Sequence, residues 1–573
     1  INLKSAPKAY VREQDKVRPP QETVDWAKRR FASLAGEVLR QTLRIDSGRL
    51  GIPVYLSLCG DRASVLTGTK KQMGKGASPA QAEASALMEL AERFSFFSFI
   101  KTTPFPLLKA EEVPGPSLDF ALAARAVQHP PSEMETGRQI FNLLPQTWAW
   151  ARNLTREREE MIPLGWFYAI NEYNGPAAGN CQEEAVLQSL CEVVERHVCA
   201  LVTLEKRTTP GIDPASVRDP VARELLDKFA QVGIKVFIKD FTCEMGIPSV
   251  AALCYDPSTF PQDSEIVYAA GTATSPAKAL IRALTEVAQL AGDFNQRTAY
   301  LVSALPKFET LDQAGYVMES AGTVPLDALP DLSNPDLLEE IKTCVQALRQ
   351  RGYEVYTLDI SHPELKIPAV YTLIPGAHFA QRTTGTDVVF HTAKLASQLE
   401  NPELALKVLG QMSQVAVESY FLPFFSALAL LNCERPDEAL ELLDRALEMN
   451  PPSQDEASIH TQRGVALKDL GRYEQAKKAL LKAAAFPEPH HEVFNLLGFC
   501  HYMQKEHEQA IECFSRAIEI EPGEAINYAN IGSNLRELGR IEEACSMYEH
   551  ALEMDPGLDF ARENLRRLRG EDG

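Results

Sequence analysis

The chain lacks three features that would narrow its class at once: paired cysteines, a long apolar run and an excess of basic residues. Its 11 cysteines include no CxxC pair, and an odd number scattered over 573 residues is not typical of a secreted disulfide framework. No apolar run reaches the roughly 20 residues of a membrane-spanning helix. We therefore expect reduced cysteines, a cytoplasmic location and no membrane or targeting segment.

Acidic residues outnumber basic ones, since 58 Lys and Arg stand against 78 Asp and Glu, giving a net charge of −20. Such a surface is not broadly attracted to nucleic acid or to anionic membranes, so neither is expected as a partner, although a local basic pocket is compatible with it. The hydrophobic content of 45% supplies apolar material for two or more cores. A single small domain is excluded.

The last third of the chain contains an internal repeat. Alanines recur at intervals of 37, 34 and 34 residues in two registers: Ala439, Ala476, Ala510 and Ala544, then Ala446, Ala483, Ala517 and Ala551. Small residues on the preceding segments keep step with them: Ala427, Gly464, Gly498 and Gly532. This period resembles the tetratricopeptide (TPR) repeat, which implies an all-α solenoid over residues 391–573. Its groove is expected to hold a partner protein, a peptide or a second copy of the chain.

Residues 1–390 have a different pattern. Short strand-like runs, at residues 54–58, 236–238, 250–253 and 369–373, alternate with long helical segments rich in Ala and Leu. The pattern predicts an α/β domain. We place its end at residue 390, where strand patterning gives way to helical periodicity.

Three helical segments of this domain share one frame, in which an alanine precedes a glutamate by seven positions. The frames are Ala82, Glu89, Glu92 and Arg93; Ala185, Glu192, Glu195 and Arg196; and Ala279, Glu286 and Gln289. The residue four before each lead glutamate is polar as well: Ser85, Gln188 and Arg282. At 3.6 residues per turn, each helix presents a narrow polar stripe between apolar residues. Glu184 extends the second stripe.

These stripes have two interpretations. They are either surface ion pairs, worth a few tenths of a kcal/mol each, or carboxylates that converge and need a cation. The threefold recurrence favours convergence, and hard oxygen ligands without His or Cys indicate Mg²⁺. Because Mg²⁺ held by few carboxylates usually shares its ligand sphere with phosphates, Arg93, Arg196 and Arg282 are candidate phosphate ligands.

Glycine-bearing loops, at residues 67–76 and 174–180, precede the first two of these helices. Neither matches a P-loop or the GxGxxG dinucleotide motif. Their position at helix starts nevertheless favours anion binding, with Lys75 in the first loop. Lys8 and Arg18, near the beginning of the sequence, are further basic candidates.

Taken together, these segments, with Ile367-Pro-Ala-Val and Pro375-Gly376, resemble the YcaO family of ATP-dependent enzymes that activate backbone amides. The resemblance spans residues 1–385 and implies ATP and Mg²⁺ as cofactors. It assigns Mg²⁺ to Glu89, Glu92, Glu192, Glu195 and Glu286. It assigns ATP to Lys8, Arg18, Lys75, Ser85, Arg93, Asn180, Glu184, Arg196 and Arg282. It identifies no catalytic residue, and it leaves open which carboxylates bind metal directly.

The resemblance also implies a reaction on a peptide or protein. A nucleophile adds to a backbone carbonyl, and the oxyanion takes the γ-phosphate of ATP. Azoline-forming members often end in a proline-rich tail, whereas this chain continues from Pro375-Gly376 into the repeats. That difference favours thioamide-type or related modification, with a sulfur-delivery protein as an expected partner. An azoline-forming cyclodehydratase and a nucleotide-bound TPR scaffold are the alternatives.

Overall fold

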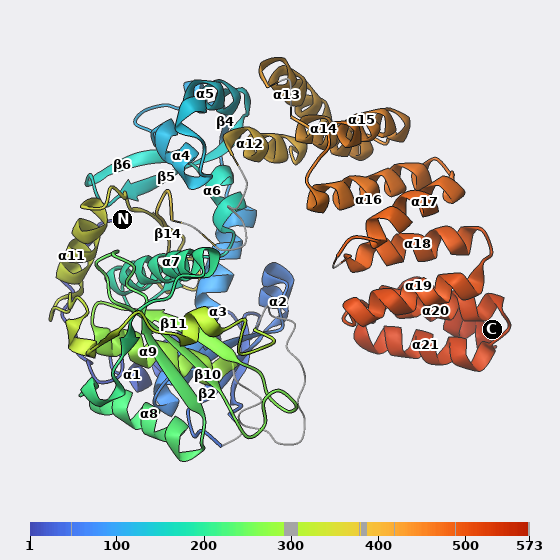
Figure 1. Ribbon diagram of the computed structural model, residues 1–573. Helices are drawn as coiled ribbons and strands as arrows, with labels where there is room; N and C mark the ends of the chain where they lie inside the picture. The colour runs from blue at the N-terminus through green and yellow to red at the C-terminus, as the bar shows by residue number, and fades with distance from the viewer. Residues whose placement is uncertain are drawn as a thin grey trace. The chain divides into compact units, whose positions relative to one another are not determined.

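The computed structural model describes residues 1–46, 49–290, 308–377, 379, 387–416, 419–487 and 489–570. The chain forms two compact units, one of residues 1–134 and 145–387, the other of residues 135–144 and 388–573 (Figure 1). The α/β and all-α parts that the sequence predicts are both present. Residues 135–144 belong to the second unit, which the sequence pattern does not indicate.

The first unit contains three sheets, in which all described strand pairs are antiparallel except β8 with β12. One sheet has the order β1-β2-β3, with strands Leu39–Arg44, Val54–Cys59 and Lys71–Lys75. The second has the order β11-β10-β9-β8-β12, with strands Val267–Thr272, Ser249–Tyr255, Lys235–Asp240, Gly211–Ile212 and Thr323–Val324. The third has the order β4-β5-β13-β14-β7, with strands Leu107–Leu108, Gln146–Asn153, Tyr356–Asp359, Ala369–Leu373 and Pro176–Ala178, and β6, Arg158–Pro163, pairs with β5. The four predicted strands are confirmed as β2, β9, β10 and β14.

Three helices of this unit carry the recurrent frame: α3 (Pro79–Thr102), α7 (Gln182–Glu205) and α9 (Pro276–Leu290). Each has buried alanine, leucine or valine residues on both sides of its polar stripe. The remaining helices are α1 (Pro20–Ala32), α2 (Asp61–Thr67), α4 (Phe120–Ala126), α6 (Leu164–Asn171), α8 (Pro220–Gln231), α10 (Gly315–Met318) and α11 (Leu337–Arg349). Two apolar cores lie in this unit, one around α7, α10 and α11 and the other around α8 and α9.

The second unit is a stack of helix pairs (Figure 1). The pairs are α14 with α15 (Phe421–Asn432, Pro436–Glu448), α16 with α17 (Ser453–Asp469, Tyr473–Ala484), α18 with α19 (His491–Met503, His507–Ile520) and α20 with α21 (Ala525–Glu537, Ile541–Met554). The remaining helices are α5 (Met134–Leu143), α12 (Val388–Ser397), α13 (Pro402–Val415) and α22 (Asp559–Leu568). A methyl group on Gly498 would lie 2.8 Å from the ring of Phe514. The recurrent small residues therefore mark the places where paired helices cross closely.

The 11 cysteines are all free thiols, as expected. Across the described ranges, no helix combines the length and the apolar character that crossing a lipid bilayer requires.

Candidate functional site

The three framed helices follow three similar junctions, in which a strand leads through a close-packed glycine into the helix. A Cβ atom on these glycines would meet the backbone of the lead alanine of the frame. The distances are 2.6 Å from Gly76 to Ala82 N, 2.6 Å from Gly179 to Ala185 N and 2.4 Å from Gly271 to Ala279 O. The alanine recurs in the frame because it lies where the helix contacts the glycine of the preceding strand or loop. The glutamate follows two helical turns later. The third glycine, Gly271, was not singled out from the sequence.

The polar stripes of α3 and α7 face a common cavity of about 120 Å³. Its walls include eight residues expected from the sequence: Lys75, Ser85, Glu89, Glu92, Asn180, Glu184, Arg282 and, within the α7 stripe, Gln188. The Asn180 side-chain amide donates to Glu184 Oε1 at 3.0 Å. The structure therefore brings these eight residues into one pocket, although the two that are farthest apart in sequence, Lys75 and Arg282, are separated by 207 positions.

The other predicted carboxylates lie around this cavity in ion pairs. Glu195 Oε2 accepts the backbone N–H of Thr272 at 2.9 Å and lies 3.5 Å from Arg282 Nη2. Glu286 pairs with Lys75. On the neighbouring helices, Glu89 pairs with Arg93 at 2.9 Å, Glu92 with Arg93 at 3.5 Å and Glu192 with Arg196 at 3.9 Å. All five carboxylates thus lie among four basic groups contributed by β3 and the three helices.

Burial shifts the pKa values of several charged groups in the site. Burial raises the pKa of Glu92 well above its usual range, and repulsion from Glu89 adds to this effect. Burial likewise raises the pKa of Glu192, against the opposing attraction of Arg196. The Lys75 pKa is lowered to about 8, first by burial and then by the neighbouring Arg282. Both signs of charge are therefore poorly solvated, as is typical of a site prepared for charged ligands.

These residues fit a magnesium–nucleotide ligand in their chemistry. The carboxylates are hard oxygen donors, burial disfavours the charged form of Glu92, and the buried Nε of Arg282 has no hydrogen-bond partner among the described residues. Within the same ranges, no three Asp, Glu, His or Cys side chains converge closely enough to hold a metal ion. Lysine and arginine groups pair with these carboxylates, so a metal ion bound here would replace some of these ion pairs.

One lysine that lines the cavity was missed in the sequence. Lys16 Nζ lies 3.3 Å from Glu184 Oε1, and the backbone N–H of Val17 donates to Glu184 Oε2 at 3.2 Å. Lys16 and Gln14 line the cavity described above and a smaller one of about 50 Å³ beside it. The segment before α1 therefore crosses the site. The only feature of the sequence that drew attention to this segment was its basic residues. Basic composition does not show which lysine lines the cavity.

Two predicted ligands lie elsewhere. Lys8 Nζ pairs with Asp15 at 2.9 Å and Glu340 at 2.6 Å, and it lines neither of the two cavities. The Arg18 guanidinium stacks over the Trp26 ring, with its carbon 4.7 Å from the ring centroid. Arg93 is also partly engaged, since its Nη1 donates to the Tyr173 carbonyl at 2.9 Å. In this structure Lys8 and Arg18 hold the N-terminal segment in place.

The fold and the site define an α/β protein with a carboxylate-rich, arginine-flanked pocket, joined to a helical-repeat unit. The model of the YcaO cyclodehydratase family, described as ATP- and Mg²⁺-binding, matches residues 73–378, more than half of the chain. The chain belongs to the YcaO family. Tetratricopeptide models match residues 457–486 and 491–556, so the second unit contains TPR repeats. The expected cofactors, ATP and Mg²⁺, agree with the family description.

Individual relatives are similar to part of the chain. An uncharacterized protein of Methanothermobacter thermautotrophicus is 28% identical over 57% of this chain and 86% of its own length. The ribosomal protein S12 methylthiotransferase accessory factor YcaO of Escherichia coli is 26% identical over 53% of this chain and 56% of its own. A heterocyclase solved with substrate and cofactor superposes with a TM-score of 0.55 and 21% identity, covering 69% of this chain and 56% of that one. The last likeness concerns the fold alone.

Proposed function

We propose that the protein uses ATP and Mg²⁺ to phosphorylate the oxygen of a peptide or protein backbone amide, leading to a thioamide-type or related modification in the cytoplasm. The observation that carries this proposal is the convergence of three framed helices on one buried, charged pocket. When bound, Mg-ATP supplies a phosphoryl group that turns the amide oxygen into a leaving group, and the metal neutralises charge during the transfer. The E. coli relative is a methylthiotransferase accessory factor, and this supports a sulfur-dependent modification as the proposed outcome.

In this proposal the acidic and basic residues of the pocket have different roles. Glu89, Glu92, Glu192, Glu195 and Glu286 hold Mg²⁺, directly or through hydrogen bonds. The basic groups Lys75, Arg196 and Arg282, with Lys16 added by the structure, bind phosphate oxygens. Ser85, Asn180 and Glu184 position the nucleotide through hydrogen bonds. Burial of the pocket excludes water, which strengthens each of these interactions and limits hydrolysis.

The second unit fits a docking role. TPR repeats stack into solenoids that bind proteins or peptides, and we assign to this unit the delivery of a substrate or of a sulfur-carrying protein, or dimerisation with a second copy. On α18, Phe499 and Met503 are exposed and lie one turn apart. A scaffold without catalysis is the competing account.

Mg-ATP binding tests the proposal directly. Glu195→Gln and Glu286→Gln remove one negative charge each without changing side-chain size, so we expect nucleotide affinity to fall at least about tenfold, or about 1.4 kcal/mol. Calorimetric titration measures affinity, and phosphate release with and without candidate peptides measures turnover. Wild-type protein that fails to bind Mg-ATP at millimolar concentration would remove the enzymatic proposal and leave the scaffold.

Lys16 and Lys8 offer a matched pair of lysines for a second prediction. Lys16→Met is expected to weaken Mg-ATP binding about tenfold, because Lys16 lines the cavity and adds a charge-assisted contact. Lys8→Met is expected to leave nucleotide affinity unchanged, while it lowers stability by about 3 kcal/mol because buried Glu340 loses its cationic partner. Thermal unfolding and nucleotide titration of both variants separate the roles, and equal effects on affinity would contradict the assignment.

A further inference from the structure

A second concave surface of the first unit lies outside the nucleotide pocket. It is a groove of about 840 Å³ between α11, the first residues of the chain and the end of the β5–β6 hairpin. Its apolar floor includes Leu3, Leu154, Leu338 and Ile341. The groove begins close to the site, because Leu337 lines the small cavity beside Glu184 and the next residue lines the groove.

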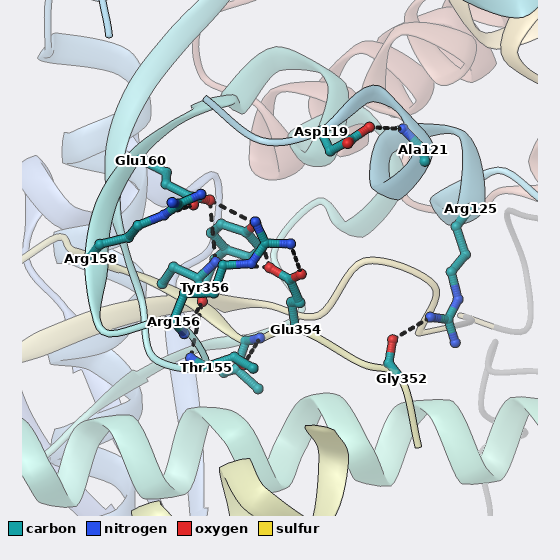
Figure 2. Close-up of polar contacts among 12 residues, drawn as sticks. Asp119, Ala121, Arg125, Thr155, Arg156, Arg158, Glu160, Gly352, Glu354 and Tyr356 are labelled. Atoms are coloured by element: carbon teal, nitrogen blue, oxygen red, sulfur yellow. Dashed lines mark hydrogen bonds and ion pairs between the residues drawn. The ribbon is translucent and has the colours of Figure 1, made fainter. Parts of the chain in front are cut away.

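The hairpin wall of this groove is held rigidly by a polar network (Figure 2). Tyr356 Oη lies 2.9 Å from Glu160 Oε2 and 3.0 Å from Glu354 Oε2, within hydrogen-bonding distance of both carboxylates. The Asn153 side-chain amide donates to the same two oxygens, at 3.2 and 2.9 Å. Each carboxylate also pairs with an arginine, Glu354 with Arg156 and Glu160 with Arg158.

This network fixes the residue that faces the groove. The backbone N–H of Thr155 donates to Asn153 Oδ1 at 3.0 Å, and Thr155 Oγ1 accepts the N–H of Val355 at 3.0 Å. Thr155 itself lines the groove. Placing two carboxylates around one tyrosine, with Glu160 buried and Glu354 partly buried, costs desolvation free energy that an apolar hairpin would avoid. The result is a wall whose shape is set before any ligand arrives, and preorganisation of this kind lowers the entropic cost of binding.

The rim of the groove has a definite chemistry. It carries the cations Arg152, Lys342 and Arg349 against one acid, Glu157, on a chain whose net charge is −20. Arg349 forms no ion pair with any residue in the described ranges, whereas Lys342 and Arg152 make exposed pairs with Glu339 and Glu159 that contribute little. The neutral amides of Asn2, Gln346 and Gln350 complete the rim. Carboxamides of this kind can pair with the N–H and C=O groups of an extended peptide backbone.

We infer that this groove binds a recognition segment of the peptide or protein substrate, an extended stretch with apolar side chains and at least one acidic residue. From Leu338 to Arg349 the helix spans about 17 Å, which matches about five residues of extended chain. Apolar side chains enter the floor, and acidic ones meet the rim. The inference rests on the proposed function in taking a peptide as the ligand. It adds a docking surface that keeps recognition separate from the reacting amide.

A library of short random peptides displayed on phage, selected on the full chain, tests this inference. We expect enrichment of apolar sequences containing Asp or Glu. Fluorescence anisotropy of labelled selected peptides then compares wild type with the double variant Lys342→Glu/Arg349→Glu. Both side chains are exposed, so folding should persist. The affinity is expected to fall at least about tenfold. Arg218→Glu/Lys235→Glu, an equal charge reversal at two exposed positions outside the groove, is the control and should bind as wild type does.

Mg-ATP titration of the same proteins separates this inference from the proposed function. Both double variants should bind nucleotide as wild type does, because neither pair lines the nucleotide cavity. Peptides that bind the groove variant as tightly as wild type occupy another surface, such as the TPR unit, and this result would overturn the groove assignment. Failure to select any peptide, or enrichment of basic peptides, would also overturn it. Loss of Mg-ATP binding by wild type would instead overturn the proposed function.

Discussion

A single methyl group at Gly74 is expected to prevent the first unit from folding stably. Gly74 lies in β3, where the strand packs directly on α3, and an added Cβ would lie 2.0 Å from Ala86 N and 2.5 Å from Ala82 O. Both atoms belong to helix backbone, so no side-chain rotation relieves the contact. Overpacking costs about 1–3 kcal/mol even where side chains adjust. We therefore expect Gly74→Ala to cost at least about 3 kcal/mol, a large part of a typical domain's stability.

Urea unfolding followed by circular dichroism measures this cost, with Gly68→Ala as the control. Gly68 also belongs to the first unit, but it has a φ of +72° and open space around its Cβ position. Its substitution should cost only about 1 kcal/mol of backbone strain. The TPR unit provides an internal reference, because its transition should be the same in both variants. Equal losses for the two substitutions would show that β3 separates easily from α3.

Helical periodicity converts spacing into position, and it placed some of the predicted residues in the cavity wall, whereas Glu192, Glu195 and Glu286 lie in ion pairs around it. Glu89 and Ser85 are four residues apart on α3, so a helix must place them on one face, and both line the cavity. No such rule applies to the segment before α1. Lys8 and Lys16 are both basic and both near α1, yet Lys8 pairs with Glu340, 332 residues away. Long-range pairing of this kind is set by tertiary packing and leaves no trace in local spacing.

The same distinction applies to the fold. The repeat period could be read because each TPR unit needs small residues where its helices cross, and Gly464, for example, would clash with Leu480 if it carried a Cβ atom. Residues 135–144 follow no repeat, and they join the second unit through Ile140 and Leu144, which pack in a core with Val389 and Leu409. An apolar stripe predicts that a helix is buried. It does not predict which unit buries it.

Glu92→Gln is expected to stabilise the ligand-free protein and to abolish its stabilisation by Mg-ATP. Burial and the adjacent Glu89 raise the pKa of Glu92, so its ionised form is unfavourable in the folded protein without metal. A neutral amide of the same size removes this penalty, and we expect a gain of about 1–3 kcal/mol in the free energy of unfolding. Arg93 keeps a partner, because Glu89 lies 2.9 Å away.

The gain should depend on pH in a defined direction. A carboxyl group whose pKa is raised by folding binds its proton more tightly in the folded state, so wild-type stability falls as the pH rises from about 4.3, the usual value, through the raised one. The amide variant lacks this contribution. In metal-free buffer containing EDTA, the two proteins should therefore be similar at low pH and diverge toward neutral pH, as thermal unfolding at several pH values would record.

Mg-ATP should offset most or all of the stability difference between the two proteins. At a hundredfold excess over its dissociation constant, a ligand stabilises the folded state by about 2.7 kcal/mol, and only wild type should receive this gain. Glu83→Gln is the matched control, because Glu83 also lies on α3 but pairs with Lys28 and Thr42, away from the cavity. That variant should keep the full ligand response and lose a little stability without ligand. A Glu92→Gln protein that is less stable without metal, or that still responds to Mg-ATP, would mean that Glu92 serves the fold rather than the ligand. A carboxylate that lowers the stability of the ligand-free protein and is needed for stabilisation by Mg-ATP is one whose position serves cation binding.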